Sequence, residues 1–283
     1  MIMDALVSAA WLAGHLDDDD LVVLDSRVVM TAVGAVADRE GYLTGHIPGA
    51  VFADLPGQLS DPAAPIGFAI PAPSALAGAL GALGVGDGSR VVIYDARLET
   101  PTGAVAGMWA ARLWWMLRWL GFDRAAVLDG GFQAWQAEGR TVRTGEETNP
   151  PQALSVRLRP ELIAGRDEVR SAIEDPHVTL VDVLDADHFA GRRSMYARPG
   201  HIVGAVNRPF ADLYDEAGRF LAPHAATQDQ PPHGGKTIVY CGAGIAASAY
   251  ALALTRAGRH DVALYAASLQ EWAADPTLPM VPG

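Results

Sequence analysis

The sequence predicts an α/β protein of two tandem domains, each a mostly parallel β-sheet flanked by helices on both faces. The chain has 283 residues, of which 50% are hydrophobic, so it is long enough for two domains of roughly 150 residues, each with its own core. Short apolar runs of strand length alternate with longer stretches of helical periodicity, a pattern typical of parallel sheets buried on both sides. Four sequence landmarks also occur twice in the same order, which indicates a duplicated domain.

The repeated landmarks make the second half of the chain a shortened version of the first. Each landmark pairs a segment of the first half with one of the second: LVVLD with VTLVD, GHIPGAV with GHIVGAV, RVVIYD with KTIVYC, and VLDGGFQAW with ALYAASLQEW. The paired segments begin at residues 21 and 178, 45 and 200, 90 and 236, and 127 and 263. Because four landmarks keep their order, the two halves are predicted to share one topology.

The elements of the first domain, expected over residues 1–140, follow from these patterns. A helix is expected from Asp4 to about Leu16, before an acidic turn of four aspartates. Apolar strands are predicted at 21–24, 91–94 and 125–128, and helices at 73–83 and 104–120.

The second domain, expected over residues 161–283, follows a polar segment at 141–160. That segment contains Pro150 and Pro151 and is predicted to be a linker. In the second domain we expect strands at 180–183, 237–240 and 262–265 and a helix at 246–257.

The charge balance and the single cysteine exclude several classes of protein. The formal net charge is −12, which argues against binding to nucleic acid or to anionic membranes, because both need clustered Lys and Arg. One cysteine cannot form an intrachain disulfide. The N-terminus lacks the basic start of a secretory signal, and the most apolar segment is short for a membrane span and carries arginines. A soluble, cytoplasmic protein is expected, and the run Asp17–Asp20 is interpreted as a solvated loop, with no metal site.

Cys241 is the candidate nucleophile because of where it lies in the pattern. It follows a predicted strand directly and precedes Gly242, Ala243 and Gly244, after which a helix is predicted. Open α/β sheets place their ligands at this end of the strands. Two glycines let successive N–H groups turn inward, and the helix N-terminus adds positive potential, so both favour a reactive thiolate. The first half has Asp95 at the equivalent position, so only the second half carries a nucleophile.

These motifs resemble those of the tandem-domain rhodanese family, the thiosulfate and 3-mercaptopyruvate sulfurtransferases, over almost the whole chain. The similarity lies in GHIPGA at 45–50, in ARLWW at 111–115, and in LDGGF at 128–132 followed by Trp135. The resemblance implies two rhodanese domains, with catalysis by the second. In that family the cysteine takes a sulfur from a small anionic donor as a persulfide and passes it to cyanide, to a thiol or to a thioredoxin-like reductant. No metal or organic cofactor is implied.

The resemblance also implies the residues that bind the donor. The loop after the cysteine contributes Gly242, Ala243, Gly244, Ile245 and Ala246. Both glycines agree with the mercaptopyruvate pattern Cys-Gly-Ser/Thr-Gly-Val-Thr-Ala, whereas the two alanines stand where hydroxyl side chains are expected. The loop has no positive charge, which counts against an ordinary preference for thiosulfate.

Charged residues outside the loop complete the predicted site. Arg192, Arg193 and Arg198 lie in the connection whose arginines, in the family, bind the anionic group of the donor. From the first domain, His46 and its upstream neighbour Asp38 are expected as a further contribution, although a structural role in a turn is the more ordinary fate of such a histidine.

Two alternatives to a sulfurtransferase remain open at the level of sequence. The missing hydroxyls at Ala243 and Ala246 fit a weakly active or non-catalytic rhodanese-like scaffold or regulatory protein. A cysteine phosphatase of the same fold is disfavoured, because its loop needs an arginine near its end and the next arginine here is Arg256, well inside the predicted helix.

Overall fold

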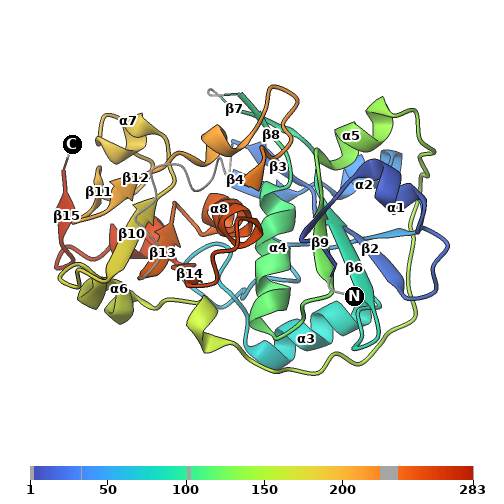
Figure 1. Ribbon diagram of the computed structural model, residues 1–283, viewed down its shortest axis with the longest axis horizontal. Helices are drawn as coiled ribbons and strands as arrows, with labels where there is room; N and C mark the ends of the chain where they lie inside the picture. Colours follow the sequence, from blue (N-terminus) through green and yellow to red (C-terminus); the bar gives the residue numbers. More distant parts are fainter. Residues whose placement is uncertain (1–2, 33, 101–102, 224–234, 283) are drawn as a thin grey trace. The chain divides into compact units, whose positions relative to one another are not determined.

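The computed structural model describes residues 3–32, 34–100, 103–223 and 235–282, and it divides into two compact units. Unit 1 comprises Met1–Ala64, Ala69–Arg159 and Glu216–Arg219, and unit 2 comprises Pro65–Phe68, Pro160–Asp215 and Phe220–Gly283. Figure 1 shows a sheet flanked by helices in each unit. None of the described helices is long and apolar enough to cross a membrane.

Unit 1 is built on a five-stranded parallel sheet in the order β1-β9-β6-β2-β5. Its strands are β1 (Leu6–Val7), β2 (Leu21–Asp25), β5 (Ala50–Phe52), β6 (Arg90–Tyr94) and β9 (Ala125–Leu128). Two antiparallel hairpins stand outside this sheet: β3 (Val28–Thr31) with β4 (Gly34–Ala37), and β7 (Leu98–Thr100) with β8 (Gly103–Val105). Apart from Arg90 at the start of β6, every residue of β6 and β9 is buried, as expected of strands covered on both faces.

Helices cover both faces of the unit 1 sheet. They are α1 (Ala9–Ala13), α2 (Arg39–Thr44), α3 (Pro73–Ala82), α4 (Met108–Trp119) and α5 (Gly131–Ala137). Leu12 of α1 and Trp135 of α5 share one buried cluster with Val23 and Val92 of the sheet. α4 packs on β6 and β9, and Figure 1 shows it on the opposite side of these strands from α1 and α5. Two helical layers around one sheet therefore enclose the core.

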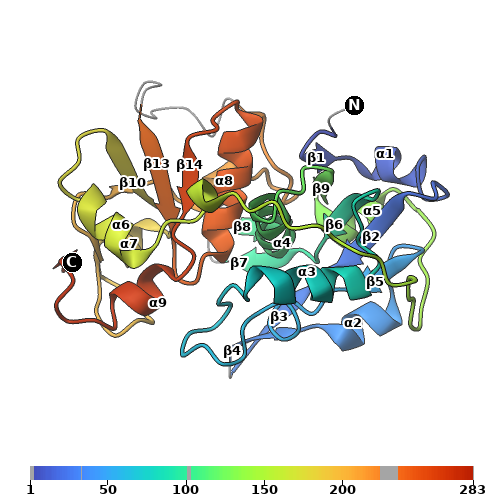
Figure 2. The ribbon, with the colours of Figure 1, turned by 90° about the horizontal axis from the view of Figure 1, so that it is seen from below.

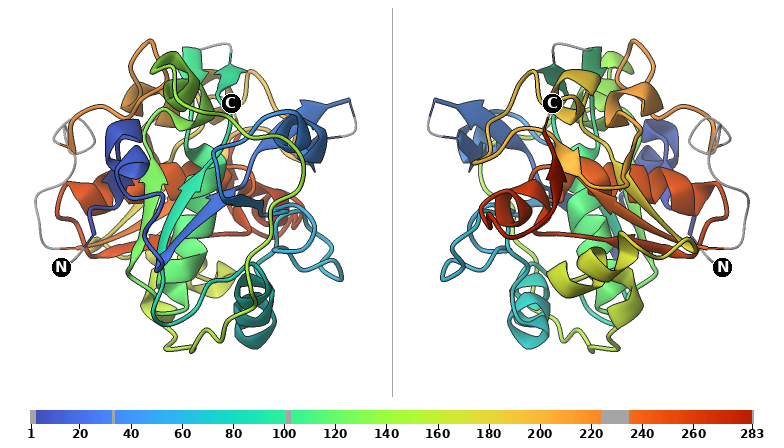
Figure 3. Two further views of the ribbon diagram at one scale, coloured as in Figure 1. Left: turned by 90° about the vertical axis from the view of Figure 1, so that its right-hand side faces the viewer. Right: turned by 90° about the vertical axis from the view of Figure 1, so that its left-hand side faces the viewer.

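Unit 2 repeats this order with a four-stranded parallel sheet, β12-β10-β13-β14. Its strands are β10 (Val178–Asp182), β12 (Val206–Asn207), β13 (Lys236–Tyr240) and β14 (Val262–Leu264), and a separate pair joins β11 (His201–Ile202) to β15 (Met280–Val281). In place of β1, unit 2 has a single parallel bridge between Ile163 and Leu264. The predicted duplication is thus confirmed by the same strand order in both sheets. Figure 3 shows the ribbon from two further sides.

The helices of unit 2 also lie on two faces of its sheet. They are α6 (Arg166–Ala172), α7 (Ala186–Phe189), α8 (Ile245–Arg256) and α9 (Ser268–Trp272), with 3₁₀ turns η1 (Pro160–Leu162) and η2 (Phe210–Leu213). Val169 of α6 and Trp272 of α9 share a buried cluster with Ile238 and Tyr240 of β13. α8 packs on β13 and β14 and is buried along most of its length.

Two expectations about local structure were wrong. The N-terminal helix does not start at Asp4: β1 comes first, because Val7 joins the sheet beside β9, and Ser8 then caps α1 by accepting the Trp11 N–H. The helix expected from residue 104 starts only at Met108, because residues 103–105 form β8. Both segments are short and apolar, and apolar character alone does not distinguish a strand of two or three residues from the start of a helix.

Residues 141–159, which were expected to be part of a linker, group with unit 1. Their backbone hydrogen bonds with unit 1 include Arg143 N–H to His46 O at 3.0 Å and Gln152 N–H to Gly81 O at 2.9 Å. Figure 2 shows this yellow-green segment passing close to α3, to which Gly81 belongs. A polar composition does not reveal such backbone pairing, because it involves no particular side chain.

Candidate active site

Cys241 lies where β13 ends and α8 is about to begin, and it is 2% exposed. Its N–H donates to Ser268 Oγ at 3.1 Å, and its carbonyl accepts the Leu269 N–H at 3.1 Å. The Ser268 hydroxyl in turn donates to Tyr265 O at 2.8 Å. The start of α9 therefore holds the cysteine backbone in place. Sequence reasoning missed Ser268, although the serine stands in one of the repeated landmarks.

The turn after Cys241 presents a row of backbone N–H groups. Gly244 is the N-cap of α8 with φ of 77°, a left-handed conformation that favours glycine. Among the described residues, the N–H groups of Gly242, Ala243 and Gly244 make no hydrogen bond. The first N–H groups of α8 also lack partners within the helix, as at any helix N-terminus. Together they form a cradle suited to an anion.

In unit 1 the corresponding backbone N–H groups bind a carboxylate. Asp95 follows β6 as Cys241 follows β13, and the N-cap of α4 is Gly107, with φ of 85°. The Asp95 carboxylate accepts the Gly107 N–H at 2.6 Å, the Trp109 N–H at 2.8 Å and the Ala110 N–H at 3.1 Å. Burial raises the pKa of Asp95 to about 6, and these three hydrogen bonds oppose the rise. The corresponding N–H groups of unit 2 belong to Gly244, Ala246 and Ala247.

A buried carboxylate accompanies the cysteine. Asp182, the last residue of β10, pairs in register with Tyr240, the residue before Cys241, and is fully buried. Its Oδ1 accepts the Leu184 N–H at 2.9 Å, whereas no hydrogen-bond partner for Oδ2 lies in the described part of the chain. Burial raises the pKa of Asp182 to about 7, and the hydrogen bond from the Leu184 N–H opposes this rise only in part.

The equivalent carboxylate of unit 1 forms an ion pair with an arginine. Asp25 is also fully buried, but the Arg27 guanidinium donates to both of its oxygens, with the shortest distance 2.6 Å from Nη2 to Oδ2. Arg27 also donates to Gly45 O at 3.0 Å. In unit 2 the residue two positions after the aspartate is Leu184. The second copy therefore has no arginine at the position that supplies the counter-charge in the first.

Tyr196 is a second residue that sequence reasoning missed. Its hydroxyl lies against Gly242: a Cβ built on this glycine would be 1.6 Å from Tyr196 Oη. The tyrosine is partly buried and packs against the core of unit 2. Burial, followed by the charges of Cys241 and Asp182, raises the pKa of Tyr196 well above that of an ordinary phenol. No sequence motif pointed to this residue, because it lies in an irregular connection 45 positions before the cysteine.

The three arginines predicted to bind the donor all have protein partners. The Arg198 guanidinium donates to four backbone carbonyl groups, those of Trp272, Ala273, Asp275 and Leu278, at 2.6–3.0 Å. Arg192 pairs with Asp187 at 2.7 Å and Arg193 with Asp185 at 2.6 Å, and both arginines are exposed. Arg198 thus ties the chain after α9 to the connection that carries Tyr196, while the other two arginines face solvent.

The two candidates from the first domain have local partners in unit 1. His46 is fully buried, stacks on Tyr42 and donates from Nδ1 to Tyr42 O at 3.0 Å. Asp38 caps α2 by accepting the Gly41 N–H at 2.9 Å. Their contribution to the cysteine site stays a prediction.

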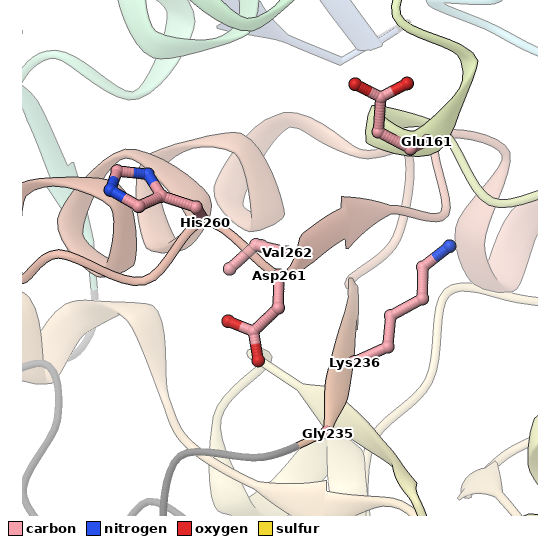
Figure 4. A pocket seen from close by; sticks show the side chains of 6 residues that line it. All are labelled: Glu161, Gly235, Lys236, His260, Asp261 and Val262. Atoms are coloured by element: carbon pink, nitrogen blue, oxygen red, sulfur yellow. The ribbon is translucent and has the colours of Figure 1, made fainter.

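One cavity of unit 2 lies at the far end of β13 from the cysteine. It has a volume of about 460 Å³ and is lined by Glu161, Gly235, Lys236, His260, Asp261 and Val262 (Figure 4). Lys236 is the first residue of β13 and Cys241 follows the last, so the cavity is at the amino ends of the strands. No group of three or more potential metal ligands occurs among the residues that the structure describes.

Comparison with known proteins identifies the class to which this fold and cysteine loop belong. The rhodanese-like domain matches the chain twice, at residues 8–138 and 165–275. The 3-mercaptopyruvate sulfurtransferase of Escherichia coli K12 is 31% identical over 98% of this chain and 97% of its own length. An Arabidopsis thaliana relative named thiosulfate/3-mercaptopyruvate sulfurtransferase 2 is 31% identical over 98% of this chain and 86% of its own.

A solved structure agrees with these relatives. The crystal structure of SseA from Escherichia coli, described as a 3-mercaptopyruvate sulfotransferase of rhodanese fold, superposes with a TM-score of 0.80 at 29% identity. The match covers 94% of this chain and 99% of SseA. The chain belongs to the rhodanese family. It is a sulfurtransferase, which favours the catalytic over the scaffold interpretation of Ala243 and Ala246.

Proposed function

We propose that the protein takes a sulfur atom from 3-mercaptopyruvate or thiosulfate, holds it as the sulfane sulfur of a persulfide on Cys241, and passes it to a thiol or cyanide. The observation that carries this proposal is the Asp95 carboxylate bound by three N–H groups in the equivalent place of unit 1. A cysteine persulfide has two atoms beyond Cβ, as an aspartate does along Cβ–Cγ–Oδ. We therefore expect the outer sulfur on Cys241 to lie near the place that corresponds to an Asp95 oxygen in unit 1, where the same kind of N–H groups would stabilise its negative charge.

The reaction runs in two displacements at sulfur. The Cys241 thiolate attacks the sulfur of 3-mercaptopyruvate, an S–S bond forms, and the C–S bond breaks with its electron pair leaving on the pyruvate enolate, which takes a proton from water. An acceptor thiolate or cyanide then attacks the outer sulfur, and the S–S electron pair returns to Cys241 as thiolate. With a thioredoxin-like dithiol as acceptor, the second thiol displaces hydrogen sulfide and a disulfide forms.

The cysteine loop, together with two arginines whose ion pairs are exposed, favours a carboxylate-bearing donor. Gly242 and Gly244 support 3-mercaptopyruvate as the first candidate, as do the relatives' names. We assign the carboxylate of the donor to Arg192 and Arg193, because their ion pairs are exposed and such pairs exchange partners at little cost. Arg198 has a positioning role in this proposal, since its donors are already used.

Mass spectrometry of the intact protein tests the proposal. After incubation with either donor and gel filtration, we expect the mass of one additional sulfur atom, localised to Cys241 by peptide mapping and lost on addition of cyanide. Cys241→Ser is the control and should gain nothing. Wild-type protein with a titrated free thiol that gains no sulfur from either donor would contradict the proposal.

A further inference from the structure

The cysteine loop of this protein lacks side-chain hydroxyl groups. Ala243 and Ala246 occupy its two candidate positions, and the nearest serines are already engaged. Ser248 donates to Gly244 O at 2.7 Å, and Ser268 donates to Tyr265 O at 2.8 Å. The loop itself therefore offers no side-chain hydroxyl to a sulfur atom on Cys241.

The Tyr196 hydroxyl is placed to be that group. It lies so close to Gly242 that no side chain larger than hydrogen fits there without moving it. Among the described residues no hydrogen-bond partner of this hydroxyl is found, although it is partly enclosed beside Cys241 and Asp182. Because its environment disfavours ionisation, the phenol keeps its proton and acts as a hydrogen-bond donor.

Two anchors fix the position of Tyr196. On one side, Ser194 Oγ accepts the Tyr196 N–H at 3.0 Å. On the other, Arg198 donates to four carbonyl groups of the segment between Trp272 and Leu278. A donor held by such supports makes its hydrogen bond without first losing conformational freedom.

We propose that the Tyr196 hydroxyl is a catalytic hydrogen-bond donor to the sulfur atom being transferred on Cys241. This inference rests on the proposed function. The hydroxyl gives no proton away: it donates a hydrogen bond to the outer sulfur as the S–S bond forms and as the persulfide anion persists. Because that sulfur is common to all donors, the effect is the same whichever molecule supplies it.

Single-turnover kinetics of persulfide formation test this role. Tyr196→Phe should form the Cys241 persulfide about 10- to 100-fold more slowly, as expected for one hydrogen bond to a charged atom, with equal slowing for 3-mercaptopyruvate and thiosulfate. Tyr214→Phe, which removes a phenol from a different aromatic cluster of unit 2, is the matched control and should react at the wild-type rate. Ala243→Ser in the Tyr196→Phe background should recover part of the rate.

The outcomes separate this inference from the proposed function. A Tyr196→Phe rate equal to wild type overturns the inference, and so does slowing with 3-mercaptopyruvate alone, which would place the hydroxyl on the leaving group. Absence of any wild-type persulfide overturns the proposed function instead. Gly242→Ala is a second variant that displaces the hydroxyl but keeps Tyr196, and it should show the same donor-independent slowing.

Discussion

Replacing Asp182 by asparagine should make unit 2 more stable at neutral and alkaline pH. Burial raises the pKa of Asp182 from 3.8 to about 7 in the folded protein. A carboxyl group with a raised folded pKa contributes its full stability below the unfolded value and loses it as the pH rises through the folded value. The wild-type protein therefore loses stability between about pH 4 and pH 7, because folding must return to Asp182 a proton that the unfolded chain has already released.

The size of the effect follows from the pKa shift. Roughly three pKa units at about 1.36 kcal/mol each correspond to about 4 kcal/mol, an upper bound because the surroundings relax around the charge. The asparagine side chain keeps an acceptor for the Leu184 N–H, so Asp182→Asn should equal wild type near pH 4 and exceed it by about 2 to 4 kcal/mol at pH 8.

Hydrogen exchange of β10 and β13 amides, followed from pH 6 to 8, measures the stability of unit 2 by itself. Leu184→Arg should also remove the pH-dependent loss, because it returns the guanidinium that Arg27 supplies to Asp25. The matched control, Asp25→Asn, breaks a buried ion pair and should destabilise unit 1 by about 3 to 5 kcal/mol. A constant difference between Asp182→Asn and wild type across this range would refute the reasoning.

Three further substitutions separate structural from substrate-binding roles. The lysine of Arg198→Lys cannot reach all four carbonyl groups, so this variant should lower the stability of unit 2 by about 2 to 4 kcal/mol in thermal unfolding. An unchanged Tm together with a tenfold higher KM for the sulfur donor would instead show that Arg198 binds that substrate. Gly200→Ala should cost more than about 2 kcal/mol, because φ is 100° and the new Cβ would meet Val281 O at 1.9 Å; a variant with the wild-type Tm would contradict this. Ser268→Ala leaves the Cys241 N–H without its acceptor, so it should lower the free energy of unfolding by about 1 to 3 kcal/mol and slow persulfide formation. A wild-type rate of persulfide formation would show that the serine does not order the loop.

Much of the fold is predictable because the same sequence pattern occurs in both halves of the chain. The uninterrupted apolar runs at β6 and β13 fit a strand of a parallel sheet that is covered by helices on both faces. The GHI motif that both units share also has a structural explanation. Ile47 N–H donates to Tyr94 Oη and Ile202 N–H to Tyr240 Oη, both at 3.1 Å, so the motif pins a turn to a central strand. The short strands β1 and β8 were missed because two or three residues are too few to show an alternation.

The cysteine loop was predictable, whereas its surroundings were not. A strand, a cysteine and two glycines before a helix are contiguous, and local sequence determines their geometry. Tyr196 reaches Gly242 through tertiary packing, and Arg198 finds its carbonyl partners more than 70 residues away. The sequence shows that an arginine carries a positive charge, but it does not show whether the guanidinium group is already hydrogen-bonded to other parts of the protein.

The two units share a cradle of backbone N–H groups at a helix N-terminus, but its role differs between them. In unit 1 the cradle at the start of α4 is permanently filled, because Asp95 supplies the anion and gains three hydrogen bonds that fix the helix to the sheet. In unit 2 the cradle at the start of α8 has no such side chain, and under the proposed function a second sulfur atom on Cys241 would carry the negative charge one bond further into it. Under the proposed function, persulfide formation would complete in unit 2 a set of hydrogen bonds that unit 1 already has. On this argument the sulfur-loaded form should be the more stable state of unit 2, and its β13 and α8 amides should exchange more slowly once sulfur is bound.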